Sequence, residues 1–344
     1  CKMLNRFPSE ILSDITGMLG NDALSSLILT GDLILTKKIR PSPVYIACEG
    51  TCETYKLLTS FFKNVKEVRF RVASSPREQI SIVSSLPKTV ESLTFTNRAG
   101  FGSDIIELLG ATLKFSDNVT DLFILDMAVH PEEVVELIPK SVTNLSMCLG
   151  DMGNRPSRDE DLPAVVKSIP NGVKKLAILS SFTGCGMFCD FASNLHDVES
   201  LEFGYYGFNL DEFCAKALPN SLASLTVKVT NNHFRIGDDF VSNLPKNLRR
   251  ITFCGGAPSS FVGLPTNIET VVIKFPGSKY RIKAKKFPST VKHVEIHAVC
   301  GDIEVKELAL QLETFYHVVP SWMGNTGQSS TGQFLREKRR LANL

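Results

Sequence analysis

The sequence predicts an α/β solenoid, in which a curved parallel sheet is backed on its convex side by helices and loops. Three observations lead to this prediction. A short apolar pattern occurs ten times along the 344 residues, successive copies begin roughly 25 residues apart, and most copies follow an apolar residue and a proline. Copies at a regular interval of about 20 to 50 residues indicate stacked units that share one core.

The repeated pattern consists of an apolar residue, two variable residues, a second apolar residue, one variable residue and a third apolar residue. All thirty apolar positions are filled, although apolar residues make up only 43% of the chain, so chance does not explain the pattern. Because side chains alternate along a strand, the fourth and sixth positions of each copy should point into a core. The first positions are Val65, Val90, Val119, Val142, Val173, Val198, Leu222, Leu248, Ile268 and Val291.

A proline stands three residues before the first position in seven of the copies. Proline cannot continue a helix, and it favours extended geometry in the residue before it. Each proline should therefore end the preceding segment and begin the turn into the next strand. The seven dipeptides are Leu86-Pro87, Ile138-Pro139, Ile169-Pro170, Leu218-Pro219, Leu244-Pro245, Leu264-Pro265 and Phe287-Pro288.

Helix-like stretches lie between the predicted strands. Residues 103–109, 130–137, 209–217 and 237–243 combine capping or acidic residues at their starts with apolar residues at helical spacing. The unit from Leu248 to Leu264 is rich in Gly, Pro and Ser, which predicts a loop or a single 3₁₀ turn. One such unit cannot bury its apolar side alone, so neighbouring units must stack.

The pattern resembles leucine-rich repeats over roughly residues 41–319, which implies about ten to eleven repeats. Its Leu-Pro-x-x-Val form is similar to a repeat variant with Leu-Pro-x-Ser-Leu before the strand, as in residues 218–222. The chain departs from the family at the ninth position. Members usually carry Asn or Cys there to satisfy backbone groups at the strand exit, and none of the ten copies does.

The first 40 residues do not follow the repeat and form a separate predicted module. The run Phe7-Pro8-Ser9-Glu10-Ile11-Leu12, followed by apolar residues in short helical pieces, resembles an F-box with Phe7 in place of the usual Leu. The resemblance implies that the module docks on a Skp-type adaptor of a cullin ubiquitin ligase. The residues that would contact the adaptor are Pro8, Ile11, Leu12, Ile15 and Leu24. The alternative is a helical cap that covers the first repeat.

An F-box followed by repeats is an order typical of that family. It implies a protein-binding adaptor that recruits a target protein to a cullin-RING (SCF) ubiquitin ligase through its repeats. The alternative is a leucine-rich-repeat scaffold with a helical N-terminal cap and no ubiquitin link.

The third, fifth and seventh positions of each repeat should line the concave face of the sheet, because they alternate with the inward positions. That face carries an apolar patch, Phe123, Leu125, Ala177 and Leu179, and a basic diagonal, Lys175, Lys228, Arg250 and Lys274. Exposed apolar side chains within a polar surface indicate a protein contact. The predicted partner-binding residues are Phe123, Leu125, Lys175, Leu179, Glu202, Lys228, Arg250 and Lys274. Loops folded over the apolar patch are the alternative.

No motif in the sequence indicates catalysis, a cofactor or a metal. There is no P-loop, no Gly-x-Ser-x-Gly and no His-Glu-x-x-His. His293, Glu295 and His297 share one strand face, but a polar surface explains them equally well. The pairs Cys48/Cys52 and Cys185/Cys189 have Cys-x3-Cys spacing, but no second pair of ligands stands near them in sequence, so we interpret them as reduced thiols. The chain is therefore not expected to be an enzyme.

Charge and composition give further expectations about partners and compartment. A net charge of +2 provides no strong field, so nucleic acid and acidic membranes are not expected partners. No apolar run approaches the length of a membrane span. Nine cysteines, an odd number without a framework of spacings, indicate a reducing compartment and hence the cytoplasm. Residues 320–344 form a predicted flexible tail whose basic stretch 336–340 makes the nucleus the alternative.

Overall fold

The structure is a computed structural model. It describes residues 44–48, 65–72, 86–97, 110, 118–125, 137–147, 169–182, 184–205, 208–229, 236–258, 261, 263–279, 282–283, 287–300, 303–304 and 313–318. The chain forms two compact units: the first comprises residues 1–156 with 168–173, and the second comprises 157–167 with 174–344. The predicted F-box-like module with Pro8, Ile11, Leu12, Ile15 and Leu24, and the predicted tail 320–344, lie outside the described residues.

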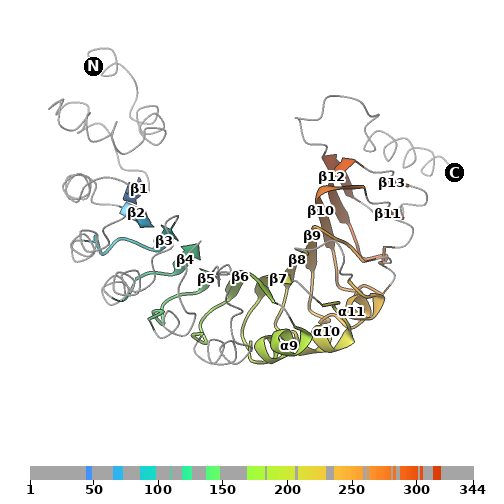
Figure 1. The fold of residues 1–344 in the computed structure, drawn as a ribbon, viewed down its shortest axis with the longest axis horizontal. Helices are drawn as coiled ribbons and strands as arrows, with labels where there is room; N and C mark the ends of the chain where they lie inside the picture. Colours follow the sequence, from blue (N-terminus) through green and yellow to red (C-terminus); the bar gives the residue numbers. More distant parts are fainter. Residues whose placement is uncertain are drawn as a thin grey trace, which may run out of the picture. The chain divides into compact units, whose positions relative to one another are not determined.

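The first unit contains a run of parallel strands (Figure 1). They are β1 (Val44–Cys48), β2 (Val65–Val72), β3 (Ser92–Asn97), β4 (Asp121–Leu125) and β5 (Asn144–Met147). Each of β1 to β4 pairs with the strand that follows it, and from β2 onward the register aligns equivalent repeat positions. The fourth positions Val68, Leu93, Leu122 and Leu145 thus lie side by side in one row.

The second unit continues the same arrangement. Its strands are β6 (Lys175–Phe182), β7 (Ser200–Tyr205), β8 (Ser224–Val229), β9 (Arg250–Cys254), β10 (Thr270–Lys279), β12 (His293–Cys300) and β14 (Thr314–Val318). All neighbouring pairs are parallel, and they keep the repeat register except at the ends of two strands, where it shifts beyond Ile178 in β6 and beyond Phe275 in β10. Two short strands, β11 (Ile282–Lys283) and β13 (Ile303–Glu304), pair separately. The chain therefore has the parallel leucine-rich-repeat solenoid fold that the sequence predicts.

The repeated apolar positions form the core. Every first, fourth and sixth position whose side chain is described is buried, which covers all thirty except Phe70. Phe95, Phe203 and Phe253, at sixth positions, are completely buried. Burial of one such side chain contributes roughly 1.5–3 kcal/mol, so the shared core supplies most of the stability of each repeat.

Three helices of the second unit lie in a row on one side of its sheet (Figure 1). They are α9 (Cys185–Ser193), α10 (Glu212–Ala217) and α11 (Asp238–Ser242). The sequence predicted α10 and α11. It missed α9, because Gly184 at the N-cap offers no side-chain acceptor and the first turn has no acidic residue. None of the helices among the described residues is long and apolar enough to span a membrane.

The loop predicted for the unit from Leu248 to Leu264 is confirmed for the part of it that the structure describes. Beyond β9 this part contains turns and bends and no helix. Its first residue after the strand, Gly255, has φ +81°, and its N–H donates to the carbonyl of Lys274 at 2.6 Å. A Cβ at this position would lie 2.3 Å from the carbonyl oxygen of Val229, so the turn requires glycine.

The prolines begin the turns, as predicted. In each of seven repeats the backbone N–H of the first position donates to the carbonyl of the proline three residues earlier, at 3.0–3.2 Å. This bond closes one turn, and the strand begins just after it. The pairs are Val90–Pro87, Val142–Pro139, Val173–Pro170, Leu222–Pro219, Leu248–Pro245, Ile268–Pro265 and Val291–Pro288.

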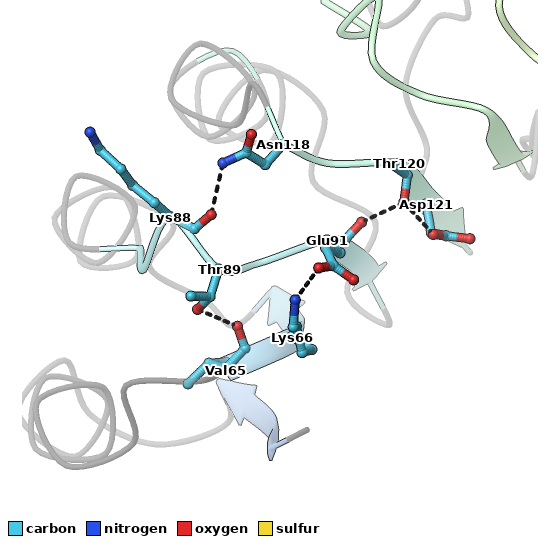
Figure 2. A network of polar contacts seen from close by, with 8 residues as sticks. All are labelled: Val65, Lys66, Lys88, Thr89, Glu91, Asn118, Thr120 and Asp121. Atoms are coloured by element: carbon cyan, nitrogen blue, oxygen red, sulfur yellow. Dashed lines mark hydrogen bonds and ion pairs between the residues drawn. The ribbon is translucent and has the colours of Figure 1, made fainter. Parts of the chain in front are cut away.

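The residue just before the first position links neighbouring repeats. The Thr89 hydroxyl donates to the backbone carbonyl of Val65 at 2.8 Å, and the Asn118 side-chain amide donates to the carbonyl of Lys88 at 2.8 Å (Figure 2). The same bonds recur from Ser141 to Val119, Ser221 to Val198, Asn247 to Asn220 and Asn267 to Lys246, at 2.7–2.8 Å. This turn ladder satisfies carbonyls at the strand entrance, whereas the family's usual ladder does so at the strand exit.

The second position of the repeats carries exposed ion pairs between neighbours. Lys66 pairs with Glu91 (Figure 2), and Lys174 with Glu199 at 3.3 Å between the charged atoms. Two further pairs are Arg249–Glu269 at 3.9 Å and Lys292–Glu313 at 3.5 Å. Exposed pairs of this kind contribute at most about 1 kcal/mol each to stability, so they add little to what holds the fold together.

Candidate partner-binding surface

The sheet of the second unit has one face that its helices leave uncovered, and we call it the open face (Figure 1). Burial alternates along its strands, as in β8, where the residues at odd repeat positions are half-buried and those between them are buried. The open face consists of three rows that the strand register aligns. The rows are Lys175, Ser200, Ser224, Arg250, Thr270 and His293; Ala177, Glu202, Thr226, Thr252, Val272 and Glu295; and Gly204, Lys228, Cys254, Lys274 and His297.

Four of the predicted binding residues are cations on this face. Lys175, Arg250 and Lys274 are exposed, and the structure shows no ion pair for any of them within the part of the chain that it describes. Lys228 is partly neutralised, because its Nζ lies 2.5 Å from a carboxylate oxygen of Glu202 on the neighbouring strand. Between β6 and β10 the open face therefore presents three cations with no ion-pair partner among the described residues, and one Lys228–Glu202 pair.

Cys254 lies between two of these lysines in the row that Lys228 and Lys274 share. Burial raises the pKa of the Cys254 thiol, and the charges of Lys274 and Lys228 offset part of that effect. The thiol is thus protonated at neutral pH and behaves as a half-buried apolar side chain.

The central row is less accessible than the sequence predicted. Val272 is completely buried, and Thr252 is nearly so. Thr94 and Ser146 occupy the corresponding row of the first unit and are buried as well. These short side chains stand in the middle of the sheet with strands on both sides, so little of their surface reaches solvent. The accessible groups of the open face are therefore its longer side chains, which are those of the outer two rows together with Glu202 and Glu295 in the central row.

The predicted apolar patch is divided between the two compact units. Phe123 and Leu125 lie on β4 in the first unit and are half-buried. Ala177 lies on β6 in the second unit and is half-buried, whereas the side chain of Leu179 lies outside the described residues. The basic group Lys175, Lys228, Arg250 and Lys274 is the part of the predicted site that falls within a single unit.

The histidines on β12 have polar partners nearby. The Nδ1 atom of His293 lies 2.7 Å from the Thr314 hydroxyl, and its Nε2 atom lies 3.8 Å from a carboxylate oxygen of Glu313. His297 contacts Glu295 on its own strand. These contacts agree with the interpretation of the three residues as a polar surface.

A second group of chemically distinct side chains lies on the helix side of the sheet. Cys185 and Cys189 on α9 and Cys214 on α10 bring their sulfur atoms within 4.8 Å of one another. Sequence reasoning treated Cys185 and Cys189 as an isolated pair. The signal that it missed is the repeat position, because Cys189 and Cys214 each stand sixteen residues after the first position of their own repeat, Val173 and Val198.

No protein-family model matches the chain, and no curated protein does either. Among solved structures, the leucine-rich-repeat-containing protein LegL7 from Legionella pneumophila is 16% identical over 61% of this chain and 90% of its own, with a TM-score of 0.38. CroV588, described as a novel circular LRR protein structure, is 18% identical over 73% of this chain and 36% of its own, with a TM-score of 0.34. Strand register and buried repeat positions define the fold of this chain.

Proposed function

We propose that this chain is a non-catalytic protein-binding scaffold whose open face holds an acidic segment of a partner protein. The observation that carries the proposal is the exposure of Lys175, Arg250 and Lys274 on one face with no ion-pair partner among the described residues. An acidic partner supplies the missing counter-charges, which favours association and selects against basic surfaces. The other face of the sheet is occupied by the core.

The size of the cationic group suits a short extended peptide. The four basic residues lie between β6 and β10, four strand spacings apart, which corresponds to about 19 Å. An extended chain covers that distance with about six residues. Because the net charge of the whole chain is only +2, the attraction is local. The pattern on the open face, and not the overall charge, therefore selects the partner.

We further propose that the bound protein is delivered to a cullin-RING (SCF) ubiquitin ligase in the cytoplasm. The support is the resemblance of the N-terminal module to an F-box, with Pro8, Ile11, Leu12, Ile15 and Leu24 as the residues that contact a Skp-type adaptor. The order of an F-box before repeats supports the same role. The competing proposal is a scaffold of the same fold whose N-terminal segment only caps the first repeat.

A pull-down with a purified Skp-type adaptor separates these two proposals. The full chain should retain the adaptor, and the double variant Ile11→Asp/Leu12→Asp should lose it, because a charge is placed in the middle of the apolar contact. If the wild-type chain retains no adaptor, the ubiquitin link is wrong and the scaffold proposal stands. Circular dichroism of both proteins verifies that the repeats remain folded.

Charge reversal tests the open face independently of the adaptor. The variant Arg250→Glu/Lys274→Glu should release proteins that co-purify with the full chain from its native cells, as measured by quantitative mass spectrometry. The matched control is Lys88→Glu/Lys246→Glu, which reverses two exposed lysines in the turns before strands and leaves the open face intact. Equal retention by both variants contradicts the proposed binding face.

A further inference from the structure

Two neighbouring helices, α9 and α10, bring three cysteine sulfurs to one place. The Sγ atoms of Cys185 and Cys189 lie 3.7 Å apart, and those of Cys185 and Cys214 lie 3.0 Å apart. The carboxylate of Asp211 adjoins the group, with Oδ1 3.8 Å from the Cys185 sulfur. Cys185 and Cys189 are half-buried and reachable from solvent, whereas Cys214 is completely buried.

The fold holds these sulfurs in place. Cys185 and Cys189 are four residues apart on α9, so their side chains share one face of the helix. That helix is anchored by Phe188, Phe191 and Ala192, which are buried, and the ring of Phe188 packs on that of Phe203 with centroids 4.4 Å apart. Stacking of the next repeat then places Cys214 against the pair. Packing alone does not require three sulfurs at one point, because apolar side chains fill the same role elsewhere in the core.

We propose that Cys185, Cys189 and Cys214 bind one zinc ion through their thiolate sulfurs, with the carboxylate of Asp211 as the fourth ligand. Zinc takes four ligands in tetrahedral geometry with zinc–sulfur distances of about 2.3 Å, which places neighbouring sulfurs about 3.8 Å apart. The separation of Cys185 and Cys189 already has this value. The Cys185–Cys214 pair must open by somewhat less than about 1 Å, which a side-chain rotation provides.

Asp211 is oriented for this role by its own helix. It is the N-cap of α10, and its Oδ1 accepts the backbone N–H groups of Phe213 at 3.0 Å and Cys214 at 3.1 Å. These two bonds hold the carboxylate beside the sulfurs and connect it to the backbone of one of the ligands. A mixed set of three thiolates and one carboxylate favours zinc over monovalent copper, which prefers sulfur alone.

Zinc binding at this group must displace thiol protons. Burial raises the pKa of the Cys189 thiol to about 11, with further increases from its neighbour Cys185 and from the charge of Asp211. Burial likewise raises the pKa of the Cys214 thiol. The thiols therefore keep their protons when no ion is bound, and zinc affinity should fall as the pH is lowered.

The site would join two adjacent repeats on the side of the sheet opposite the open face. It is independent of the proposed binding function, because it shares no residue with the open face. Its effect would be structural: an ion bound to the folded chain and not to the unfolded chain stabilises the folded state by mass action. Zinc should therefore raise the melting temperature of the second unit.

Cobalt(II) is the probe that reports the ligands directly. The full chain, purified metal-free and kept reduced with a phosphine, is titrated with Co²⁺ and then with Zn²⁺. One equivalent of Co²⁺ should produce the thiolate-to-cobalt charge-transfer absorption and the visible bands of a tetrahedral ion, and Zn²⁺ should remove both. The variants Cys185→Ser and Cys189→Ser should each lower the zinc affinity by more than about tenfold, since even loss of a partner outside the ligand set typically costs roughly 10–100-fold.

Further variants make the test specific. Asp211→Asn should retain the charge-transfer absorption and weaken zinc binding, because an amide is a poorer ligand than a carboxylate. Cys254→Ser, a half-buried cysteine on the open face, is the matched control and should bind both ions as the wild type does. Zinc should raise the melting temperature of the wild type and of the control, but not that of Cys185→Ser.

Three results would overturn the proposal. The first is a wild-type chain that shows no charge-transfer absorption with Co²⁺. The second is binding lost only in Cys214→Ser, the buried position, while Cys185→Ser and Cys189→Ser bind normally. The third is a Cys185–Cys214 disulfide that persists in the reduced preparation, which would identify the group as a redox pair.

Discussion

The hydroxyl of Ser221 donates to the backbone carbonyl of Val198, one repeat earlier, at 2.8 Å. The same hydroxyl lies 3.0 Å from the carbonyl of His196. Ser221 stands directly before the first position of its repeat, and Val198 is the first position of the preceding one. One side chain thus connects the entrance of two successive strands. Each repeat is held to its neighbour by a side-chain bond in the turn as well as by the sheet.

We expect Ser221→Ala to lower the free energy of unfolding by about 0.5–1.5 kcal/mol, because the two carbonyls lose the one O–H donor that they share. The control is Ser242→Ala, whose exposed hydroxyl bonds within its own helix to the carbonyl of Asp239. It should change stability by less than about 0.5 kcal/mol. Urea unfolding followed by circular dichroism measures both, and equal losses would show that the turn ladder is not a stabilising device.

The two threonines at this repeat position should respond in opposite ways to valine. Thr89 donates to the carbonyl of Val65, whereas the buried Oγ1 of Thr290 has no hydrogen-bond partner among the described residues. Thr89→Val should therefore destabilise the chain by about 1 kcal/mol, and Thr290→Val should be neutral or stabilising by up to about 1 kcal/mol. The comparison uses thermal melts of both variants. A loss of stability in Thr290→Val would mean that its hydroxyl has a partner.

Two glycines should respond in opposite ways to alanine. Gly255 has φ +81°, and a Cβ there would meet the Val229 carbonyl oxygen at 2.3 Å. Gly255→Ala should thus lower stability by about 2 kcal/mol or more. Gly186 is exposed on α9 with no atom within 4 Å of an added Cβ, so Gly186→Ala should raise stability by about 0.5–1 kcal/mol. The midpoint of urea unfolding is measured for both variants, and an unchanged midpoint for Gly255→Ala would contradict the described turn.

Phenylalanine truncation distinguishes the core from the surface. Phe253 is completely buried and packs near Phe261 with ring centroids 6.2 Å apart. Phe253→Ala should reduce the free energy of unfolding by about 3–5 kcal/mol, because it removes buried apolar surface and leaves a cavity. Phe213 on α10 is 65% exposed, so Phe213→Ala should change it by less than about 1 kcal/mol. Similar losses in both variants would place Phe253 outside the core.

The strands and the core could be predicted because every repeat carries the same local pattern of apolar residues. Leu201 and Phe253, for example, are buried because they belong to the alternating apolar positions, which share one face of their strands. The same alternation placed Arg250 and Lys274 on the opposite face, where the structure shows them exposed. β1 and β14 lie beyond the ten copies of the pattern but within the predicted repeat region.

The features that were missed depend on contacts between repeats. The cluster of Cys189 with Cys214 becomes visible only when residues one repeat apart are placed side by side. The burial of Val272 depends on neighbouring strands and not on its own sequence context. Helix α9 lacks the capping residues by which a helix start is recognised, and packing of Phe188 and Phe191 replaces that signal.

The ion pairs at the second position limit how such an array can change its length. Arg249 faces Glu269, and the next equivalent residue along the chain is Lys292, which faces Glu313. Excision of the single repeat that carries Glu269 would bring two cations face to face at the new junction, whereas excision of two successive repeats would restore opposite charges. The second position thus favours removal of repeats in pairs over removal of one, by at most about 1 kcal/mol for each exposed pair.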